Sequence, residues 1–221
     1  MSCATVGLSD SDYKKLSSSV FMVGNEMLTH RKQVKHFHEP GDCHELTFSC
    51  HQRKPLLTNP VWKKMLCHSI DQALIRYQFH LIAFVIMPEH VHLLVYPTAH
   101  DCKIDGFLAA IKRPFSYRIK QLLTKQQAPL LTELTIRTRP GKTAFRFWLE
   151  GPGFDRNFFS KKAVESAVNY IHLNPVKRKL SSESREWKWS SARWYESNGE
   201  FIDPDLPTIH GLPWGFFLQT H

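Results

Sequence analysis

Two histidines one residue apart, His90 and His92, are the side chains of this sequence with the clearest capacity for chemistry. They lie in the run FVIMPEHVHLLV, where a Pro-Glu pair separates two apolar stretches. Successive side chains of a strand alternate between faces, so both imidazoles point the same way and Val91 points the other way. Each ring nitrogen on such an aliphatic strand needs a partner. One interpretation is a divalent cation bound by both rings, and the other is a surface-facing pair on an edge strand.

A second pair with chemical capacity, Tyr170 and Asn174, follows about eighty residues later. The two are four residues apart in a segment of helical periodicity, so their side chains lie one turn apart on one flank of its apolar stripe. A phenol and an amide at this border could face a cleft. The alternative is a tyrosine packed at a rim and an asparagine that caps the helix. The apolar stripe consists of Val164, Ala167, Val168 and Ile171.

The elements around these residues follow from periodicity and from helix-capping signals. Asn59 before Pro60 and Ser160 before residue 161 predict helix starts. Pro114 should kink or break the second helix, and Asn174-Pro175 should end the third. We expect strands over 44–50, 80–87, 90–96 and 145–149, and helices over 60–77, 104–119 and 161–173. This order is typical of an α+β, ferredoxin-like split βαβ sandwich with an antiparallel sheet, in which the histidine pair lies on a strand and Tyr170 on a C-terminal helix.

The composition indicates a globular protein with an anionic partner. Of the 221 residues, 42% are hydrophobic, and 29 Lys and Arg against 20 Asp and Glu give a formal net charge of +9. For a protein of this kind nucleic acid is the commonest anionic partner. We expect an N-terminal extension over residues 1–35, one domain over 36–200 and a C-terminal tail over 201–221.

The cysteines and the hydropathy indicate a cytoplasmic protein. Five cysteines with no C-x-x-C pair predict neither a disulfide framework nor a zinc ribbon. The first residues lack the pattern of a secretory signal. The longest apolar run, residues 81–87, is far too short to span a bilayer, so we expect no membrane association.

Two blocks of the sequence resemble a known family. MPEHVHLL at residues 87–94 and YIHLNPVK at residues 170–177, in this order and spacing, are similar to the REP-associated tyrosine transposases, a group of the HUH single-tyrosine transposases of small insertion sequences. The segments FW at 147–148, GPGFDRN at 151–157 and WKWSS at 187–191 also resemble this family. The resemblance extends from about residue 36 to residue 195.

The resemblance implies a division of labour among four residues. His90 and His92 match the pair that holds Mg²⁺ or Mn²⁺, and Asn174 falls where relatives place a third ligand, often Gln. Tyr170 matches the nucleophile, which would attack a phosphodiester and form a 5′-phosphotyrosine with a free 3′-hydroxyl. A phenol with a pKa of about 10 needs help to react at neutral pH, and the sequence does not identify the helper.

The resemblance also implies a DNA partner, either single-stranded or folded into the hairpins of palindromic REP elements. The oligomeric state is open between monomer and homodimer. One alternative is a catalytically silent hairpin-binding protein or repressor on the same fold. Another, a histidine-triad phosphohydrolase, requires a third alternating histidine, and that position is Leu94. We expect phosphate contacts from six cations, namely Lys112, Arg113, Arg118, Arg156, Lys177 and Arg178.

Overall fold

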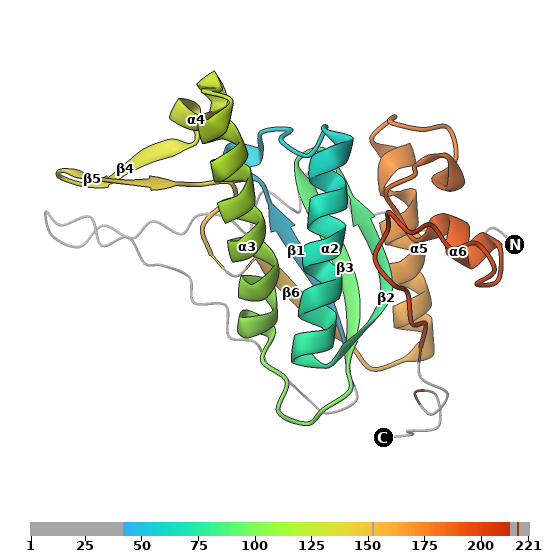
Figure 1. Ribbon diagram of the computed structural model, residues 1–221. Coiled ribbons are helices and arrows are strands. Elements are labelled where there is room, and N and C mark those ends of the chain that lie inside the picture. Colours follow the sequence, from blue (N-terminus) through green and yellow to red (C-terminus); the bar gives the residue numbers. More distant parts are fainter. Residues whose placement is uncertain (1–41, 152, 213–215, 217–221) are drawn as a thin grey trace, which may run out of the picture. The chain divides into compact units, whose positions relative to one another are not determined.

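A four-stranded antiparallel sheet forms the centre of the fold (Figure 1). The computed structural model describes residues 42–151, 153–212 and 216, so the predicted N-terminal extension lies outside the described residues. The sheet has the order β2-β3-β1-β6, with every neighbouring pair antiparallel. Its strands are β1 (Cys43–Ser49), β2 (Phe79–Ile86), β3 (His90–Pro97) and β6 (Phe154–Phe158).

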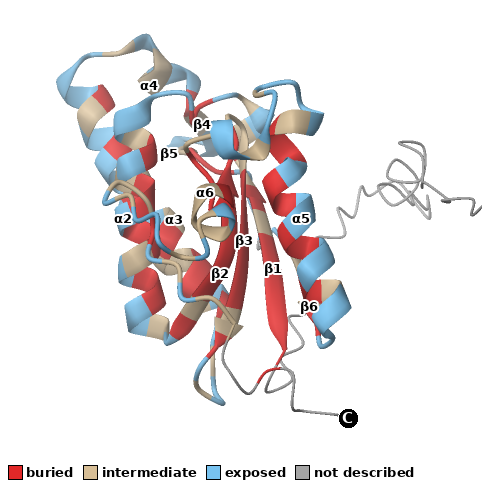
Figure 2. Cartoon of the chain, turned by 90° about the vertical axis from the view of Figure 1, so that its right-hand side faces the viewer, coloured by how far each residue is buried: buried red, intermediate tan, exposed pale blue. Residues whose placement is uncertain are grey.

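Helices cover both faces of this sheet. Figure 2 shows α2 (Pro60–Tyr77) and α3 (Ile104–Lys125) on one side of the buried strands and α5 (Lys161–Lys177) on the other. A second sheet consists of β4 (Thr135–Arg139) and β5 (Lys142–Phe145) alone. The short helical elements are α4 (Pro129–Glu133), α6 (Ala192–Glu196) and the 3₁₀ turns η1 (His51–Arg53) and η2 (Ser184–Glu186). Among the described helices, not one combines the length and the apolar character that a bilayer crossing needs.

This arrangement confirms the predicted α+β class with an antiparallel sheet. Strands β1 and β2 both run antiparallel to β3, which lies between them, so they form the two halves of a split βαβ unit with α2 as the crossover. Both predicted helix caps are present. The Asn59 side chain accepts hydrogen bonds from the first turn of α2, and the Ser160 hydroxyl accepts one from the Ala163 amide of α5.

Three element predictions were wrong. Residues 145–149 form no strand of the main sheet, apart from an isolated bridge between Trp148 and Cys50; the fourth strand is β6, whose polar sequence lies at the sheet edge. Pro114 does not divide α3, which runs unbroken through it. Pro175 lies inside α5, which ends two residues later at Lys177. The helix tolerates this proline because only a short length of helix remains beyond it.

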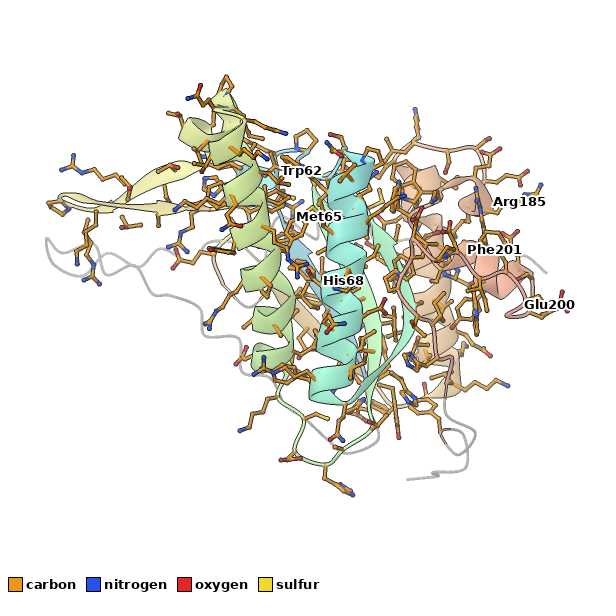
Figure 3. The ribbon with its side chains drawn as sticks, viewed as in Figure 1. Trp62, Met65, His68, Arg185, Glu200 and Phe201 are labelled. Atoms are coloured by element: carbon orange, nitrogen blue, oxygen red, sulfur yellow. The ribbon has the colours of Figure 1, made fainter. Side chains whose placement is uncertain are left out.

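Two hydrophobic clusters hold the layers together. The larger one lies beneath α2 and α3 and includes the packed rings of Phe115, Phe147 and Trp148, so residues 147–148 serve the core as a buried loop. Figure 3 shows Trp62, Met65 and His68 along the side of α2 that is turned toward α3. The smaller cluster joins the other face of the sheet to the apolar stripe of α5. The sheet is therefore buried on both faces.

The outer edge of β2 is covered by the segment that follows α5. The Ile86 amide donates to the Trp189 carbonyl, and the Phe84 amide donates to the Ser191 hydroxyl. The hydroxyl of Tyr195 donates to the Ile82 carbonyl. These contacts satisfy backbone groups that would otherwise invite pairing with another strand. The Ser191 hydroxyl also lies 2.7 Å from His172 Nε2, so the same residue ties α5 to the sheet edge.

We predict that Ser191→Ala lowers the free energy of unfolding by about 1–3 kcal/mol, because it leaves the buried Phe84 amide without its acceptor. Urea denaturation followed by circular dichroism measures this loss. Ser166→Ala is the control, since this exposed hydroxyl bonds only to the Lys162 carbonyl of its own helix, and its effect should stay within about 0.5 kcal/mol. Equal stabilities of the two variants would contradict the bridging role of Ser191.

Candidate active site

The two histidines of β3 project from the sheet toward α5, as their alternation with Val91 predicted. Val91 is packed in the cluster beneath α2 and α3, on the opposite face. The two imidazole rings lie with centroids 4.8 Å apart at an angle of 81°. Burial and the neighbouring His92 lower the pKa of His90 to about 4, so the His90 ring is neutral at physiological pH. A neutral imidazole can serve as a metal ligand or as a hydrogen-bond partner.

The Nδ1 atom of each ring has a carboxylate partner within the fold. His92 Nδ1 lies 2.8 Å from the Thr47 hydroxyl and 3.3 Å from a Glu45 carboxylate oxygen, both on β1. His90 Nδ1 lies 3.1 Å from a Glu89 carboxylate oxygen. A carboxylate on Nδ1 favours the tautomer in which Nδ1 carries the proton and Nε2 keeps its lone pair. This is the pattern that orients histidine ligands in metal sites.

Helix α5 brings Tyr170 and Asn174 to the same face of the sheet. The Tyr170 ring stands edge-on to the His92 ring at 5.8 Å between centroids and is 42% exposed. Asn174, one turn further along, is buried, and its Nδ2 atom has no hydrogen-bond partner among the residues that the structure describes. An amide buried without a full set of partners is costly. The predicted meeting of the histidine pair with this helix flank is present in the structure.

A glycine permits the close approach of β6 to the strand that supports His92. Gly153 has a φ of +92°, and a Cβ atom at this position would collide with the carbonyl oxygen of Thr47. The Thr47 hydroxyl is the atom that contacts His92. Gly153, which belongs to a segment that resembles the family, therefore acts through its backbone next to the site.

The six cations predicted to contact phosphate fall into different environments. Lys177 and Arg178 lie at the site: Lys177 Nζ is 4.8 Å from the Tyr170 ring centroid, and Arg178 pairs with Glu89 at 2.8 Å. Arg156 is exposed on β6, in register with Glu45. The remaining three residues, Lys112, Arg113 and Arg118, lie on α3, which covers the other face of the sheet.

Lys112 is turned inward from α3. Its ammonium donates to the Gly151 carbonyl at 3.3 Å and lies 5.1 Å from the centroid of the Phe48 ring. Burial lowers the pKa of Lys112 to about 8. Arg113 and Arg118, in contrast, are exposed. The structure therefore brings Lys177, Arg178 and Arg156 toward the histidine face of the sheet and leaves the α3 cations elsewhere.

Three functional neighbours escaped the sequence analysis, namely Glu45, Thr47 and Glu89. Glu89 adjoins His90 and forms a chain with it and Arg178, so its position in the motif was a usable signal. Glu45 and Thr47 contact His92 only because of the register between β1 and β3. Within residues 42–151, 153–212 and 216, no three His, Cys, Asp or Glu side chains are placed to hold a metal ion. A metal here would depend on the two imidazoles and the Asn174 amide.

The fold is an antiparallel α+β fold, and it places a tyrosine against two histidines. This arrangement makes the protein a candidate for phosphoryl transfer. Comparison with known families names the class further. Residues 43–133 match the family described as "Transposase IS200 like". The resemblance to the REP-associated tyrosine transposases is thereby confirmed. No curated protein matches the sequence.

Two solved structures are similar to this chain. One is a REP-associated tyrosine transposase bound to a REP hairpin, which is 18% identical, covers 84% of this chain and 96% of its own, and superposes with a TM-score of 0.60. Another, a candidate transposase from Deinococcus radiodurans R1, is 17% identical, covers 62% of this chain and 94% of its own, and has a TM-score of 0.40. The family match and the shared fold together support a transposase-type role in DNA processing.

We predict that Asn174→Leu raises the free energy of unfolding by about 1–2 kcal/mol, because it removes a buried donor that has no partner. Chemical denaturation measures the change. Asn157→Leu is the matched control: its amide donates to the Asp42 carboxylate at 3.3 Å, so the same substitution there should destabilise the protein. A loss of stability in both variants would mean that the Asn174 amide contributes to the fold.

Proposed function

We propose that the protein cleaves and rejoins single-stranded or hairpin DNA through a covalent 5′-phosphotyrosine on Tyr170, with His90, His92 and Asn174 as ligands of Mg²⁺ or Mn²⁺. One observation carries the proposal: the Tyr170 ring stands against the His92 ring, while both histidines are held through Nδ1 by the fold. The family match of residues 43–133 and the fold shared with a hairpin-bound relative support it.

The donor set suits a hard divalent cation with open coordination positions. Two imidazole Nε2 atoms and the amide oxygen of Asn174 are the ligands that this site offers to a cation. The buried Nδ2 atom of Asn174, which has no partner among the described residues, is a donor that a phosphate oxygen would satisfy. A bound cation would polarise the scissile phosphate and offset the charge that develops on the leaving 3′-oxygen. Glu45 and Glu89 keep the two rings in the orientation that such a ligand requires.

Tyr170 supplies the covalent step. Its phenolic oxygen attacks the phosphorus, the bond from phosphorus to the 3′-oxygen breaks, and the strand ends are a 5′-phosphotyrosine and a 3′-hydroxyl. Attack by another 3′-hydroxyl reverses the step and releases the tyrosine, so strands are rejoined without an external energy source. Lys177 lies over the Tyr170 ring at 4.8 Å, and a positive charge there favours the phenolate that must form.

The cations around the site are the contacts for the DNA backbone in this proposal. Lys177 and Arg156 are exposed on the side of the sheet that carries the histidines. Arg178 is half-exposed and is oriented by Glu89, so it can reach a phosphate from a fixed position. Arg113 and Arg118 are exposed on α3 and would contact only DNA that passes around the domain. Lys112 points inward and donates to the Gly151 carbonyl, so its role is structural.

The second candidate function is hairpin binding without catalysis, as in a repressor. The exposed cations would serve it equally well. However, binding alone does not require an asparagine buried without a partner or two histidines fixed through carboxylates. The Asn174 donor without a partner among the described residues is costly to the fold, and this cost favours the enzyme.

We predict that the protein, incubated with Mn²⁺ and a labelled single-stranded oligonucleotide containing a hairpin, forms an adduct that survives denaturing electrophoresis. Tyr170→Phe should abolish the adduct and leave the dissociation constant for the DNA within about twofold, because only the nucleophilic oxygen is lost. Tyr117→Phe, at an exposed tyrosine of α3, is the control and should keep the adduct. Hairpin binding without an adduct under either metal would favour the silent binding protein.

We predict that Glu45→Gln weakens Mn²⁺ binding by about 10–100-fold, because His92 loses the carboxylate that holds its ring. Isothermal titration calorimetry measures this affinity, and adduct formation should return at a saturating Mn²⁺ concentration. Glu165→Gln, at an exposed glutamate of α5 that pairs only with Lys161, should leave the Mn²⁺ affinity unchanged. Equal affinities in the wild type and the Glu45 variant would remove Glu45 from the site.

A further inference from the structure

The strands β4 and β5 form a ribbon that extends away from the rest of the described fold (Figure 1). The ribbon turns at Pro140-Gly141, where Gly141 has a φ of +73°, and every residue from 137 to 143 is exposed. A two-stranded ribbon of this size buries too little surface to be stable alone. It depends on its root, where Leu134 and Phe147 are buried and the Arg146 amide donates to the Leu134 carbonyl at 2.7 Å.

The ribbon is strongly cationic. Residues 134–149 include four arginines and lysines and no aspartate or glutamate. Of these, Arg146 pairs with Glu150, whereas Arg137, Arg139 and Lys142 make no ion pair with any residue that the structure describes. Arg139 and Lys142 are also cross-strand partners at the tip. Two positive charges directly opposite each other on neighbouring strands destabilise a ribbon. We therefore interpret the tip as a binding surface for an anionic partner.

The root of the ribbon lies at the end of the sheet that carries the histidines. The His51 amide donates to the Phe147 carbonyl, and the Leu149 amide donates to the Ser49 carbonyl. Ser49 is the register partner of His90. The ribbon therefore leaves the domain at the strand end next to the candidate active site. DNA that is bound by the ribbon can extend to the candidate active site.

We propose that the β4–β5 ribbon binds the double-stranded stem of the DNA, with its cationic tip in the major groove, while an adjacent single strand enters the site at His90, His92 and Tyr170. The placement of the single strand rests on the proposed function. The major groove of B-form DNA, about 12 Å wide, admits a two-stranded ribbon and exposes phosphates on both sides to arginine and lysine. A five-residue strand is about 17 Å long, so the ribbon covers about five base pairs.

The form of the duplex decides between DNA and RNA. The major groove of A-form RNA is deep and narrow, and side chains cannot read it. A ribbon that enters the groove therefore requires B-form DNA, whereas a merely electrostatic contact would accept either duplex. This difference gives the proposal a direct test.

The test replaces Arg137, Arg139 and Lys142 together by glutamine and measures binding by fluorescence anisotropy. The probes are a DNA hairpin with a single-stranded flank, an unstructured oligonucleotide of the same length, and an RNA hairpin. We expect the dissociation constant for the DNA hairpin to rise about tenfold or more. The slope of the logarithm of the binding constant against the logarithm of the salt concentration should become less steep by up to about 2.7, at about 0.9 for each lost phosphate contact. Binding of the unstructured strand should change by less than about twofold.

The matched control removes three exposed cations at the opposite end of the strands, where β3 ends and α3 and α5 begin. It is the triple variant of Arg76, Lys103 and Lys162 to glutamine, which lowers the net charge equally. We expect hairpin binding within about threefold of the wild type. Equal losses in the two triple variants, equal losses for the hairpin and the unstructured strand, or equal losses for DNA and RNA hairpins would each overturn the proposal.

A second measurement does not depend on the variant. Hydroxyl-radical footprinting of the wild type on the DNA hairpin should show protection of about five consecutive stem base pairs, and a stem without protection would overturn the proposal. Adduct formation on Tyr170 is scored separately. A stem footprint without an adduct would support the ribbon proposal and refute the proposed function. An adduct without a stem footprint would support the proposed function and refute the ribbon proposal.

Discussion

The register between β1 and β3 is the constraint on which the candidate site depends. It sets Thr47 opposite His92 and Ser49 opposite His90, and it places the Glu45 carboxylate within 3.3 Å of the His92 ring. A slip of one residue would turn both histidines into the apolar layer beneath α2 and α3. The buried residues of β1 on that side, which fit only one register, therefore protect the geometry of a site on the opposite face.

Helix α5 is divided between packing and chemistry in the same way. One face of the helix places Val164, Val168 and Ile171 against the sheet, and this apolar contact fixes the position and rotation of the helix. The flank beside this face carries Tyr170 and Asn174. The hydrogen bond between His172 and Ser191 adds a further constraint, because Ser191 is itself bonded to the β2 edge. The position of the tyrosine is thus set by residues that take no part in the chemistry.

Sequence patterns predicted the elements whose signals are local and strong. The strands at 79–86 and 90–97 and the helix at 60–77 lie within about a residue of their predicted limits. The helix at 161 begins where its cap predicted, although it ends at Lys177 and not at residue 173. Strand β6 was missed because an edge strand tolerates charges, so FDRNF has no apolar alternation to detect. The aromatic run at 145–149 had the composition of a strand, but its rings fill a space between α3 and the sheet that only the tertiary structure defines.

The same limit applies to the site. His90 and His92, and likewise Tyr170 and Asn174, are close in sequence, so their shared faces follow from strand and helix geometry. That the two pairs meet could be expected only from the resemblance to a family, because it requires the packing of α5 on the sheet. The contacts of Glu45 and Thr47 with His92 span about 45 residues and depend on a strand register that no local pattern states.

The net charge of +9 shows why cations cannot be assigned to DNA one by one from the sequence. Several are committed to the fold: Lys63 is buried with its ammonium near the rings of Trp187 and Trp189, and Lys64 pairs with Asp205. Burial lowers the pKa of Lys63, which is the cost of that packing. What distinguishes a candidate DNA contact is therefore the absence of such a commitment. By that criterion the exposed cations of the β4–β5 ribbon are better candidates for DNA contacts than Lys112, which the sequence analysis predicted to contact phosphate.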